Sequence, residues 1–111
     1  MSIPHPIPYQ GSKRGLAKVI LSLIPTNAEK IIEPFAGSSA ISLVSAYYQK
    51  ANGYFLNDIN VPLMNLWKEI IENPESLAGK YEVLWKKQLG KEREYYDFVR
   101  NQFNETHRPD L

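Results

Sequence analysis

The segment KIIEPFAGSSAISL, from Lys30 to Leu43, decides how this chain folds. Its beginning is a short apolar run typical of a strand, and its end carries apolar residues at helical spacing. Between them, FAGSS at Phe35–Ser39 forms a glycine bend. Open α/β sheets bind small ligands at such a bend, just beyond the carboxyl end of a strand. The segment therefore predicts a strand, a ligand-binding loop and a helix in succession.

A second strand is expected after that helix. The turn signal in NGYFLND precedes an apolar run at about Tyr54–Asn57, and Ser38 or Ser39 can cap the intervening helix. A strand, a helix and a second strand in this order imply a parallel pair with a right-handed crossover. The sequence thus indicates an α/β fold with two parallel strands.

The remaining segments are expected to be mostly helical. Prolines keep residues 1–10 extended, and Ser12 begins a helix that Pro25 ends. Three further helices are expected to begin near Asn60, Asn73 and Lys91. The stripe predicted to be buried on the first helix consists of Leu16, Val19, Ile20, Leu23 and Ile24.

Two parallel strands are too few for a finished sheet, because parallel sheets normally have more strands and are covered on both faces. We therefore expect the chain to be incomplete as a folding unit. In the isolated chain we expect Trp67, Trp85 and the stripe from Tyr95 to Phe103 to lie partly exposed.

The composition narrows the possible chemistry. With 111 residues, 43% hydrophobic and 23% charged, the chain is typical of a globular domain or part of one, and its net charge is +1. It has no cysteine, which excludes disulfides, thiolate metal sites and cysteine nucleophiles. His5 and His107 lack metal-ligand spacing, so we expect no metal. The sequence shows neither a signal peptide nor an apolar run long enough to span a bilayer, and a cytoplasmic protein is expected.

The charges around the bend favour one class of ligand. Asp58 ends the second strand at the position where a carboxylate accepts hydrogen bonds from ribose hydroxyls. Ser39 replaces the second glycine of a dinucleotide site, and Glu33 would repel a pyrophosphate. S-adenosylmethionine, which is cationic and has a ribose but no phosphate, suits these residues better than NAD. The alternative is that Gly37 only permits a tight turn and Asp58 only caps one.

A second candidate segment is YQGSKRG, at Tyr9–Gly15. Lys13 lies near a helix start, where the helix dipole disfavours a cation, so a role facing the ligand is as reasonable as a solvated surface charge. Tyr9 can pack against the helix or stack on a base. The spacing leaves both alternatives open.

These segments together resemble the Dam-type family of DNA adenine-N6 methyltransferases. PIPYQGSK is similar to the N-terminal cofactor motif of that family, IIEPFAGSSAISL to its E-P-F-x-G-x-G loop, and YFLNDINVPLMNLWKEI to its strand-acid segment. YYDFVRNQFNE resembles the helix that begins the target-recognition insertion of the family. Ser39, in place of glycine, is the one departure inside a motif.

The resemblance implies a partial Rossmann-like methyltransferase fold that binds S-adenosylmethionine. Residues 1–72 would form the cofactor-binding half and residues 73–111 the start of target recognition. The cofactor-contacting residues would be Tyr9, Lys13 and Asp58, with Glu33, Phe35 and Gly37 forming the floor of the pocket.

The catalytic residues of the family are expected elsewhere. Its members rotate adenine out of double-stranded DNA and methylate it at an Asp-Pro-Pro-Tyr loop, which this sequence lacks. We therefore expect an N-terminal subunit or fragment that is inactive alone and needs a complementary methyltransferase chain bearing that motif. The alternatives are a regulatory module or inactive remnant that binds S-adenosylmethionine or DNA without catalysis, and an unrelated dinucleotide-binding fragment.

Overall fold

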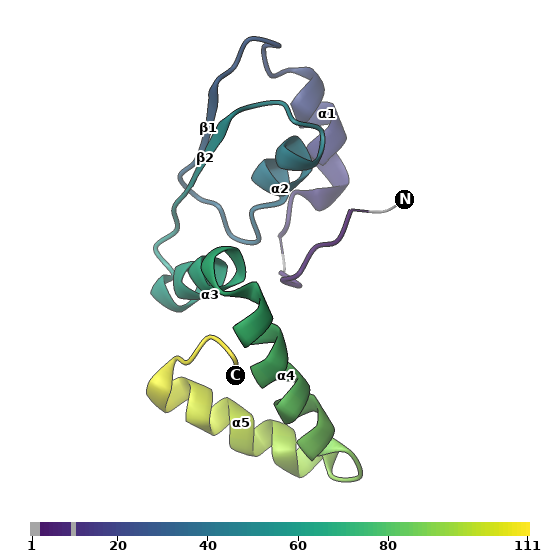
Figure 1. Ribbon diagram of the computed structural model, residues 1–111, viewed down its shortest axis with the longest axis vertical. Coiled ribbons are helices and arrows are strands. Elements are labelled where there is room, and N and C mark those ends of the chain that lie inside the picture. The colour runs from purple at the N-terminus through teal and green to yellow at the C-terminus, as the bar shows by residue number, and fades with distance from the viewer. Residues whose placement is uncertain (1–2, 10) are drawn as a thin grey trace. The chain divides into compact units, whose positions relative to one another are not determined.

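The computed structural model describes residues 3–9 and 11–111 (Figure 1). Residues 3–9 contain neither helix nor strand and bend at Pro6 and Ile7, where an extended segment was expected, and the expectations for Met1, Ser2 and Gln10 lie outside the described residues. The elements follow one another in the predicted order. They are η1 (Arg14–Leu16, a 3-10 helix), α1 (Ala17–Ser22), β1 (Lys30–Glu33), α2 (Ala40–Tyr47), β2 (Gly53–Leu56), α3 (Val61–Glu72), α4 (Pro74–Gln88) and α5 (Glu92–Thr106).

The chain forms two compact units, one ending at Asn60 and the other spanning Val61–Leu111. The first unit contains both strands, and the second contains α3, α4 and α5. This structural boundary precedes α3. The functional division into residues 1–72 and 73–111 is a separate statement and stays a prediction.

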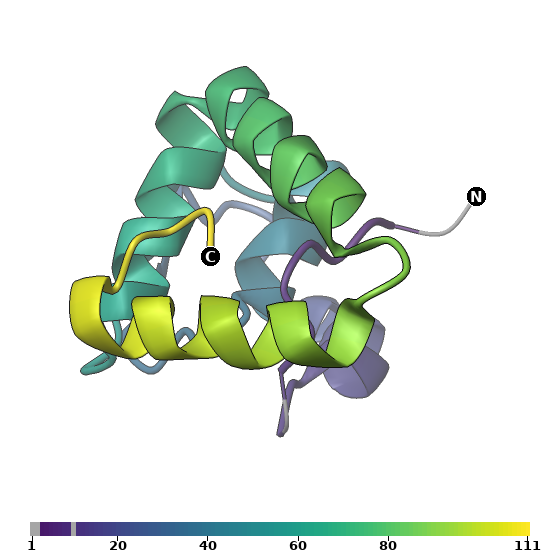
Figure 2. The same cartoon turned by 90° about the horizontal axis from the view of Figure 1, so that it is seen from below.

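The second unit is entirely helical. A turn at Gly90, whose φ is +83°, joins α4 to α5 (Figure 2). Trp67 on α3 is only 6% exposed, so the expectation that it would be partly exposed is wrong, whereas Trp85 on α4 is 50% exposed as expected. Among the residues that the structure describes, no helix is both long and apolar enough to cross a membrane.

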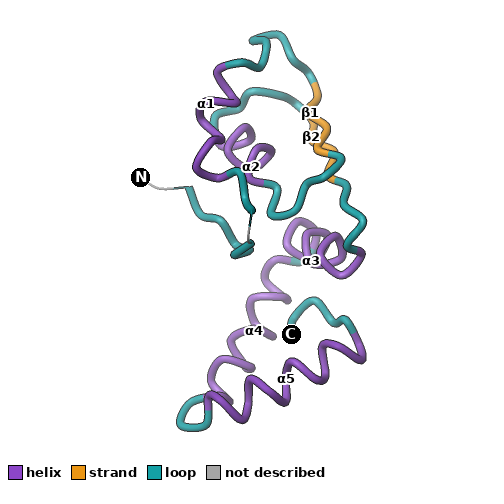
Figure 3. The backbone as a smooth tube through the Cα atoms, turned by 180° about the vertical axis from the view of Figure 1, so that it is seen from behind, coloured by secondary structure: helices purple, strands orange, loops and turns teal. Residues whose placement is uncertain are grey.

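The sheet consists of β1 and β2, which pair in parallel as predicted (Figure 3). Ile31 lies opposite Tyr54, and Ile32 lies opposite Phe55. The Tyr54 hydroxyl lies 3.3 Å from Oγ of Ser45 on α2 and shares a hydrogen bond with it. Because successive residues of a strand point to opposite faces, this contact assigns Ile31 and Tyr54 to the face that α2 covers.

In the described part of the chain the other face of the sheet is largely exposed, although the Lys30 ammonium lies 5.7 Å from the centroid of the Phe55 ring. Ile32 is 67% exposed and its partner Phe55 is 52% exposed. Parallel strands are normally buried on both faces, because their connecting helices cover both sides. The first unit therefore has an exposed apolar sheet face of the kind that is usually buried in parallel sheets.

The core of the first unit lies between α1 and α2, and it corrects the predicted face of α1. Ala17, Leu21 and Val44 form the buried cluster, with Ile24 packed against it, whereas Leu16, Val19 and Leu23 are 55%, 62% and 80% exposed. The first turn is a 3-10 helix, and α1 begins at Ala17 rather than near Ser12. A 3-10 turn has three residues instead of 3.6, so it changes the direction in which the following residues point.

Candidate functional site

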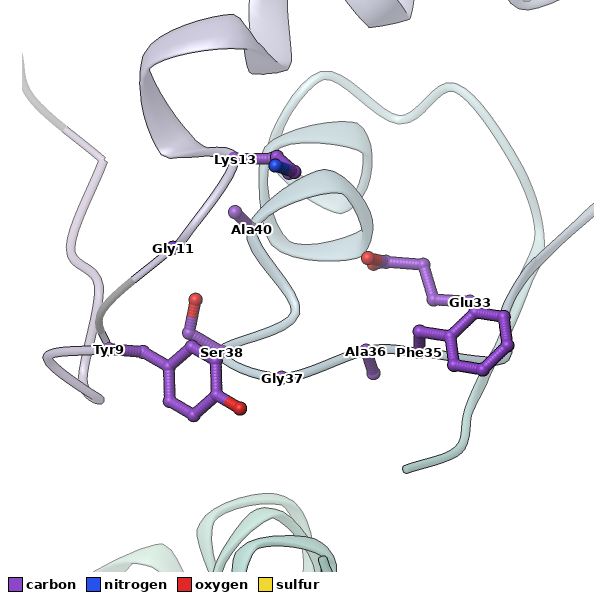
Figure 4. Close-up of a pocket in the computed structure, with 9 residues that line it drawn as sticks. All are labelled: Tyr9, Gly11, Lys13, Glu33, Phe35, Ala36, Gly37, Ser38 and Ala40. Carbon is purple, nitrogen blue, oxygen red and sulfur yellow. The ribbon is translucent and has the colours of Figure 1, made fainter. Parts of the chain in front are cut away.

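A cavity of about 90 Å³ lies beyond the carboxyl end of β1 (Figure 4). Two segments distant in sequence line it: one contributes Tyr9, Gly11 and Lys13, and the other runs from Glu33 at the end of β1 through the loop to the start of α2. The structure thus brings most of the predicted site residues around one cavity. Those that line it are Tyr9, Lys13, Glu33, Phe35 and Gly37.

Tyr9 packs on Gly37, which explains the glycine. Gly37 has φ of +54°, and a Cβ at this position would lie 2.9 Å from Cε1 of Tyr9. A side chain at position 37 would therefore be strained and would also displace the ring. Tyr9 remains 42% exposed, so the packing against the loop leaves part of the ring accessible to a ligand.

Phe35 differs from the expected floor residue. Its side chain is 90% exposed, and Figure 4 shows the ring at the edge of the group that surrounds the cavity. In this unit Phe35 lies at the rim of the cavity.

Glu33 caps helix α2. Its Oε1 accepts a hydrogen bond of 2.6 Å from the backbone N–H of Ser42, in the first turn of the helix. Ser39 occupies the N-cap position, as predicted, but its side chain makes no capping hydrogen bond. A carboxylate at this end also interacts favourably with the helix dipole. The negative charge that the sequence places at the strand end is therefore directed at the helix N-terminus.

Asp58 connects the two strand ends and is not among the cavity-lining residues. Its Oδ2 accepts a 3.1 Å hydrogen bond from the Gly37 N–H, and its Oδ1 accepts a 3.0 Å bond from the Asn60 N–H. The backbone of Asn57 adds to this connection, because its carbonyl accepts a 2.8 Å bond from the Ala36 N–H. The glycine loop is thus fixed to the end of β2. The alternative that Asp58 only caps a turn accounts for its hydrogen bond with Asn60 but not for its hydrogen bond with Gly37.

Two serines that the sequence suggested only as possible helix caps join the first segment to the loop. The hydroxyls of Ser12 and Ser38 lie 3.0 Å apart and form a hydrogen bond. Ser12 precedes Lys13, so this bond fixes the turn that carries the lysine. The only sequence signal for these contacts is the abundance of serine in the two motifs, because residues 12 and 38 are far apart along the chain.

Ser39 adopts a conformation that favours glycine. Its φ and ψ are 54° and 37°, in the left-handed region, and the residue is 1% exposed. Its Oγ is buried, and within residues 3–9 and 11–111 it has no hydrogen-bond partner. The left-handed conformation costs about 1–2 kcal/mol for a residue with a Cβ. Serine at this position therefore destabilises the loop.

We expect Ser39→Gly to stabilise the chain by about 1 kcal/mol, because glycine removes the left-handed strain and the unpaired hydroxyl but makes the unfolded chain more flexible. Urea unfolding, followed by circular dichroism at low protein concentration, measures the change. Ser38→Gly is the matched control and should be destabilising, since it removes the bond to Ser12. A lower urea midpoint for Ser39→Gly than for the unmodified chain would contradict the expectation.

Sequence comparisons relate nearly the whole chain to known proteins. The sequence profile of the D12 class N6 adenine-specific DNA methyltransferases matches residues 9–111. The Retron Ec67 DNA adenine methylase of Escherichia coli is 30% identical over 96 residues, which cover 86% of this chain and 31% of that protein. The Type II methyltransferase M1.LlaDCHI of Lactococcus lactis subsp. cremoris is 35% identical over 88 residues, covering 79% of this chain and 28% of that protein.

A third relative is the DNA N-6-adenine-methyltransferase of Escherichia phage P1, which is 30% identical over 106 residues, covering 93% of this chain and 13% of that protein. The chain thus spans less than a third of the length of each of these relatives. No solved structure matches the chain.

Proposed function

This chain belongs to the family of D12 class N6 adenine-specific DNA methyltransferases, which confirms the resemblance of its motifs, and we propose that it supplies the S-adenosylmethionine-binding part of a DNA adenine-N6 methyltransferase. The proposed fold is the first part of a Rossmann-like methyltransferase domain. The proposed substrate is adenine in double-stranded DNA, and a cytoplasmic location belongs to the same proposal.

The observation that carries the proposal is the cavity at the end of β1. Tyr9, Lys13 and Gly37 come from the two motifs that the resemblance assigns to the cofactor, and all three line this cavity. Its volume of about 90 Å³ is smaller than the roughly 300–1,000 Å³ of complete small-molecule sites. It therefore accommodates only the part of a cofactor nearest to the strand, and further walls would have to complete the pocket.

Electrostatics support S-adenosylmethionine over a dinucleotide. A pyrophosphate binds at a helix N-terminus through free backbone N–H groups. In α2 one of these groups, on Ser42, already donates to the Glu33 carboxylate, whose negative charge would repel a phosphate. The same charge attracts a ligand that carries a sulfonium and an ammonium group. Glu33 thus serves both the helix and the selectivity of the proposed site.

Asp58 fits a double role in the proposed site. Each of its carboxylate oxygens accepts one backbone N–H, and a carboxylate has about four acceptor positions in all. The remaining positions can accept the ribose hydroxyls of the cofactor while the loop stays fixed. In this proposal Asp58 holds both the glycine loop and the ligand.

Methyl transfer needs residues that these 111 positions do not contain. The sequence lacks the Asp-Pro-Pro-Tyr segment that would hold the amine of the rotated adenine. We propose that a complementary chain supplies it together with further strands. The uncovered sheet face at Ile32 and Phe55 is the surface that such a chain would cover.

Calorimetry with Lys13→Met tests the cofactor site. We expect about a tenfold loss of S-adenosylmethionine affinity, because Lys13 lines the cavity and can donate to the carboxylate of the cofactor's methionine part, a charged hydrogen bond that contributes about 1.5–3 kcal/mol. The free energy of unfolding should change little. No carboxylate in the described part of the chain lies within ion-pair distance of the Lys13 ammonium.

Lys30→Met is the matched control, since Lys30 is an exposed lysine of the same unit that does not line the cavity. It should leave the affinity unchanged. If Lys13→Met binds S-adenosylmethionine as well as Lys30→Met does, Lys13 is a surface charge. Binding of NAD in preference to S-adenosylmethionine would overturn the proposed function itself.

A further inference from the structure

A second, larger cavity of about 490 Å³ lies in the first unit and shares no lining residue with the cavity at the end of β1. Residues of the N-terminal segment, of η1, of α1 and of the α2 end form its walls. Its volume lies within the range of small-molecule sites, about 300–1,000 Å³. The N-terminal segment, η1 and α1 each contribute one basic side chain, those of His5, Arg14 and Lys18. The remaining lining residues are largely apolar.

The charge around this cavity is positive and uncompensated. The sequence has no aspartate or glutamate before Glu29, whereas Lys13, Arg14 and Lys18 all precede it. In residues 3–9 and 11–111, neither Arg14 nor Lys18 forms an ion pair. Two cations facing one cavity repel each other, so an anion bound between them would lower the electrostatic energy.

His5 reports the same positive potential. Burial lowers the pKa of His5 from its usual value of 6.5, and the positive charge of Arg14 lowers it further. The other charged or titratable groups that line the cavity are Lys18 on α1 and Tyr48 after α2. Both effects favour the neutral form of the His5 ring. Its Nδ1 is buried and has no hydrogen-bond partner among the described residues.

The apolar wall indicates which kind of anion fits. Ile3, Val44 and Tyr48 form this wall, and none of the described residues that line the cavity is acidic. Tyr48 is 46% exposed. A cavity with two cations and an apolar wall suits a phosphate attached to a sugar better than a free, fully hydrated ion. Arginine also binds phosphate oxygens in a bidentate manner.

We propose that this cavity binds a backbone phosphate of DNA, with Arg14 and Lys18 holding the phosphate and the wall of Ile3, Val44 and Tyr48 contacting the adjoining sugar. The inference rests on the proposed function in one respect, since that function makes DNA the partner. A phosphate contact of this kind positions the duplex and is independent of its base sequence.

The test measures binding of a fluorescent DNA duplex to the 111-residue chain by anisotropy at several salt concentrations. We expect Arg14→Gln and Lys18→Gln each to weaken DNA binding about five- to tenfold, equally for different sequences. The slope of log affinity against log salt should become shallower by about 0.9 when one phosphate contact is lost. Lys30→Gln, which removes one charge of the same unit outside the cavity, should have a much smaller effect.

A second measurement identifies the ligand group. Titration of inorganic phosphate, followed by NMR of the His5 ring, should raise the pKa of His5, because the anion compensates the charge of Arg14. Arg14→Gln should abolish this response. The His107 signal, from the second unit, serves as the internal reference.

The outcomes separate this inference from the proposed function. Unchanged DNA affinity and salt slope in the Arg14→Gln, Lys18→Gln double variant would overturn the phosphate site, whatever S-adenosylmethionine does. Inorganic phosphate could raise the pKa of His5 while neither substitution changes the DNA affinity. In that case the cavity binds free phosphate and the assignment to DNA is wrong. S-adenosylmethionine affinity should be unaffected by either substitution, because the two cavities share no lining residue.

Discussion

Mixing this chain with a polypeptide that carries the missing strands and an Asp-Pro-Pro-Tyr segment is expected to produce methyl transfer to adenine in DNA that neither polypeptide catalyses alone. We expect no detectable transfer by either polypeptide alone and measurable turnover by the mixture. Incorporation of labelled methyl groups from S-adenosylmethionine into duplex DNA measures it. The two polypeptides should also elute together from a sizing column.

The uncovered surfaces of the first unit are the physical reason. Ile32 and Phe55 expose one sheet face, and each strand has one edge without a neighbour in the described part of the fold. Unpaired strand edges and exposed apolar residues favour strand addition or aggregation. We expect the chain alone to self-associate as its concentration rises. Leu16, Val19 and Leu23 of the same unit are also exposed.

The matched control uses the same complementary polypeptide with alanine in place of the aspartate of its Asp-Pro-Pro-Tyr segment. It should still bind the chain but should not restore transfer. A cooperatively folding monomer that methylates DNA without a partner would contradict the proposal of a complementary chain. A complex that binds S-adenosylmethionine and DNA but never transfers a methyl group would favour the non-catalytic alternative.

The second large effect is expected for Asp58→Ala, which should lower S-adenosylmethionine affinity about ten- to hundredfold. Each hydrogen bond to the carboxylate contributes about 1.5–3 kcal/mol, and 1.4 kcal/mol corresponds to a factor of ten in affinity. The substitution also removes the bonds to the Gly37 and Asn60 N–H groups. Calorimetry on the completed assembly measures the affinity.

Asp58→Asn separates the two roles of this residue. Asparagine keeps one oxygen that can accept the Gly37 N–H, but it loses the negative charge and half of the acceptor positions. We expect it to retain most of the loop stability and still to bind the cofactor more weakly than aspartate does. Amide hydrogen exchange at Gly37 reports the loop. Unchanged affinity in both variants would leave Asp58 as a structural connection between the two strand ends.

Local patterns in the sequence determined the elements and the position of the site. The apolar run before the bend, the glycine at position 37 and the second apolar run predict β1, the loop and β2, because strand and turn preferences are properties of neighbouring residues. Their order predicts a parallel pair, because a helix between two strands returns the chain to the end of the sheet where the first strand began, and the second strand then runs in the same direction. The same motifs predicted that Tyr9 and Lys13 lie near the loop, and both line the cavity at the end of β1.

Tertiary structure alone decided which partners these residues have. The hydrogen bonds from Ser42 to Glu33 and from Gly37 to Asp58 join residues that no local pattern connects. Glu33 and Asp58, which the sequence suggested as cofactor-binding residues, therefore also stabilise α2 and the glycine loop. The buried face of α1 was likewise set by the 3-10 turn and by packing of Ala17 and Leu21 beside Val44, against the face that periodicity favoured. Periodicity shows that a helix has an apolar face, but the direction of that face depends on where the helix begins and on what packs against it.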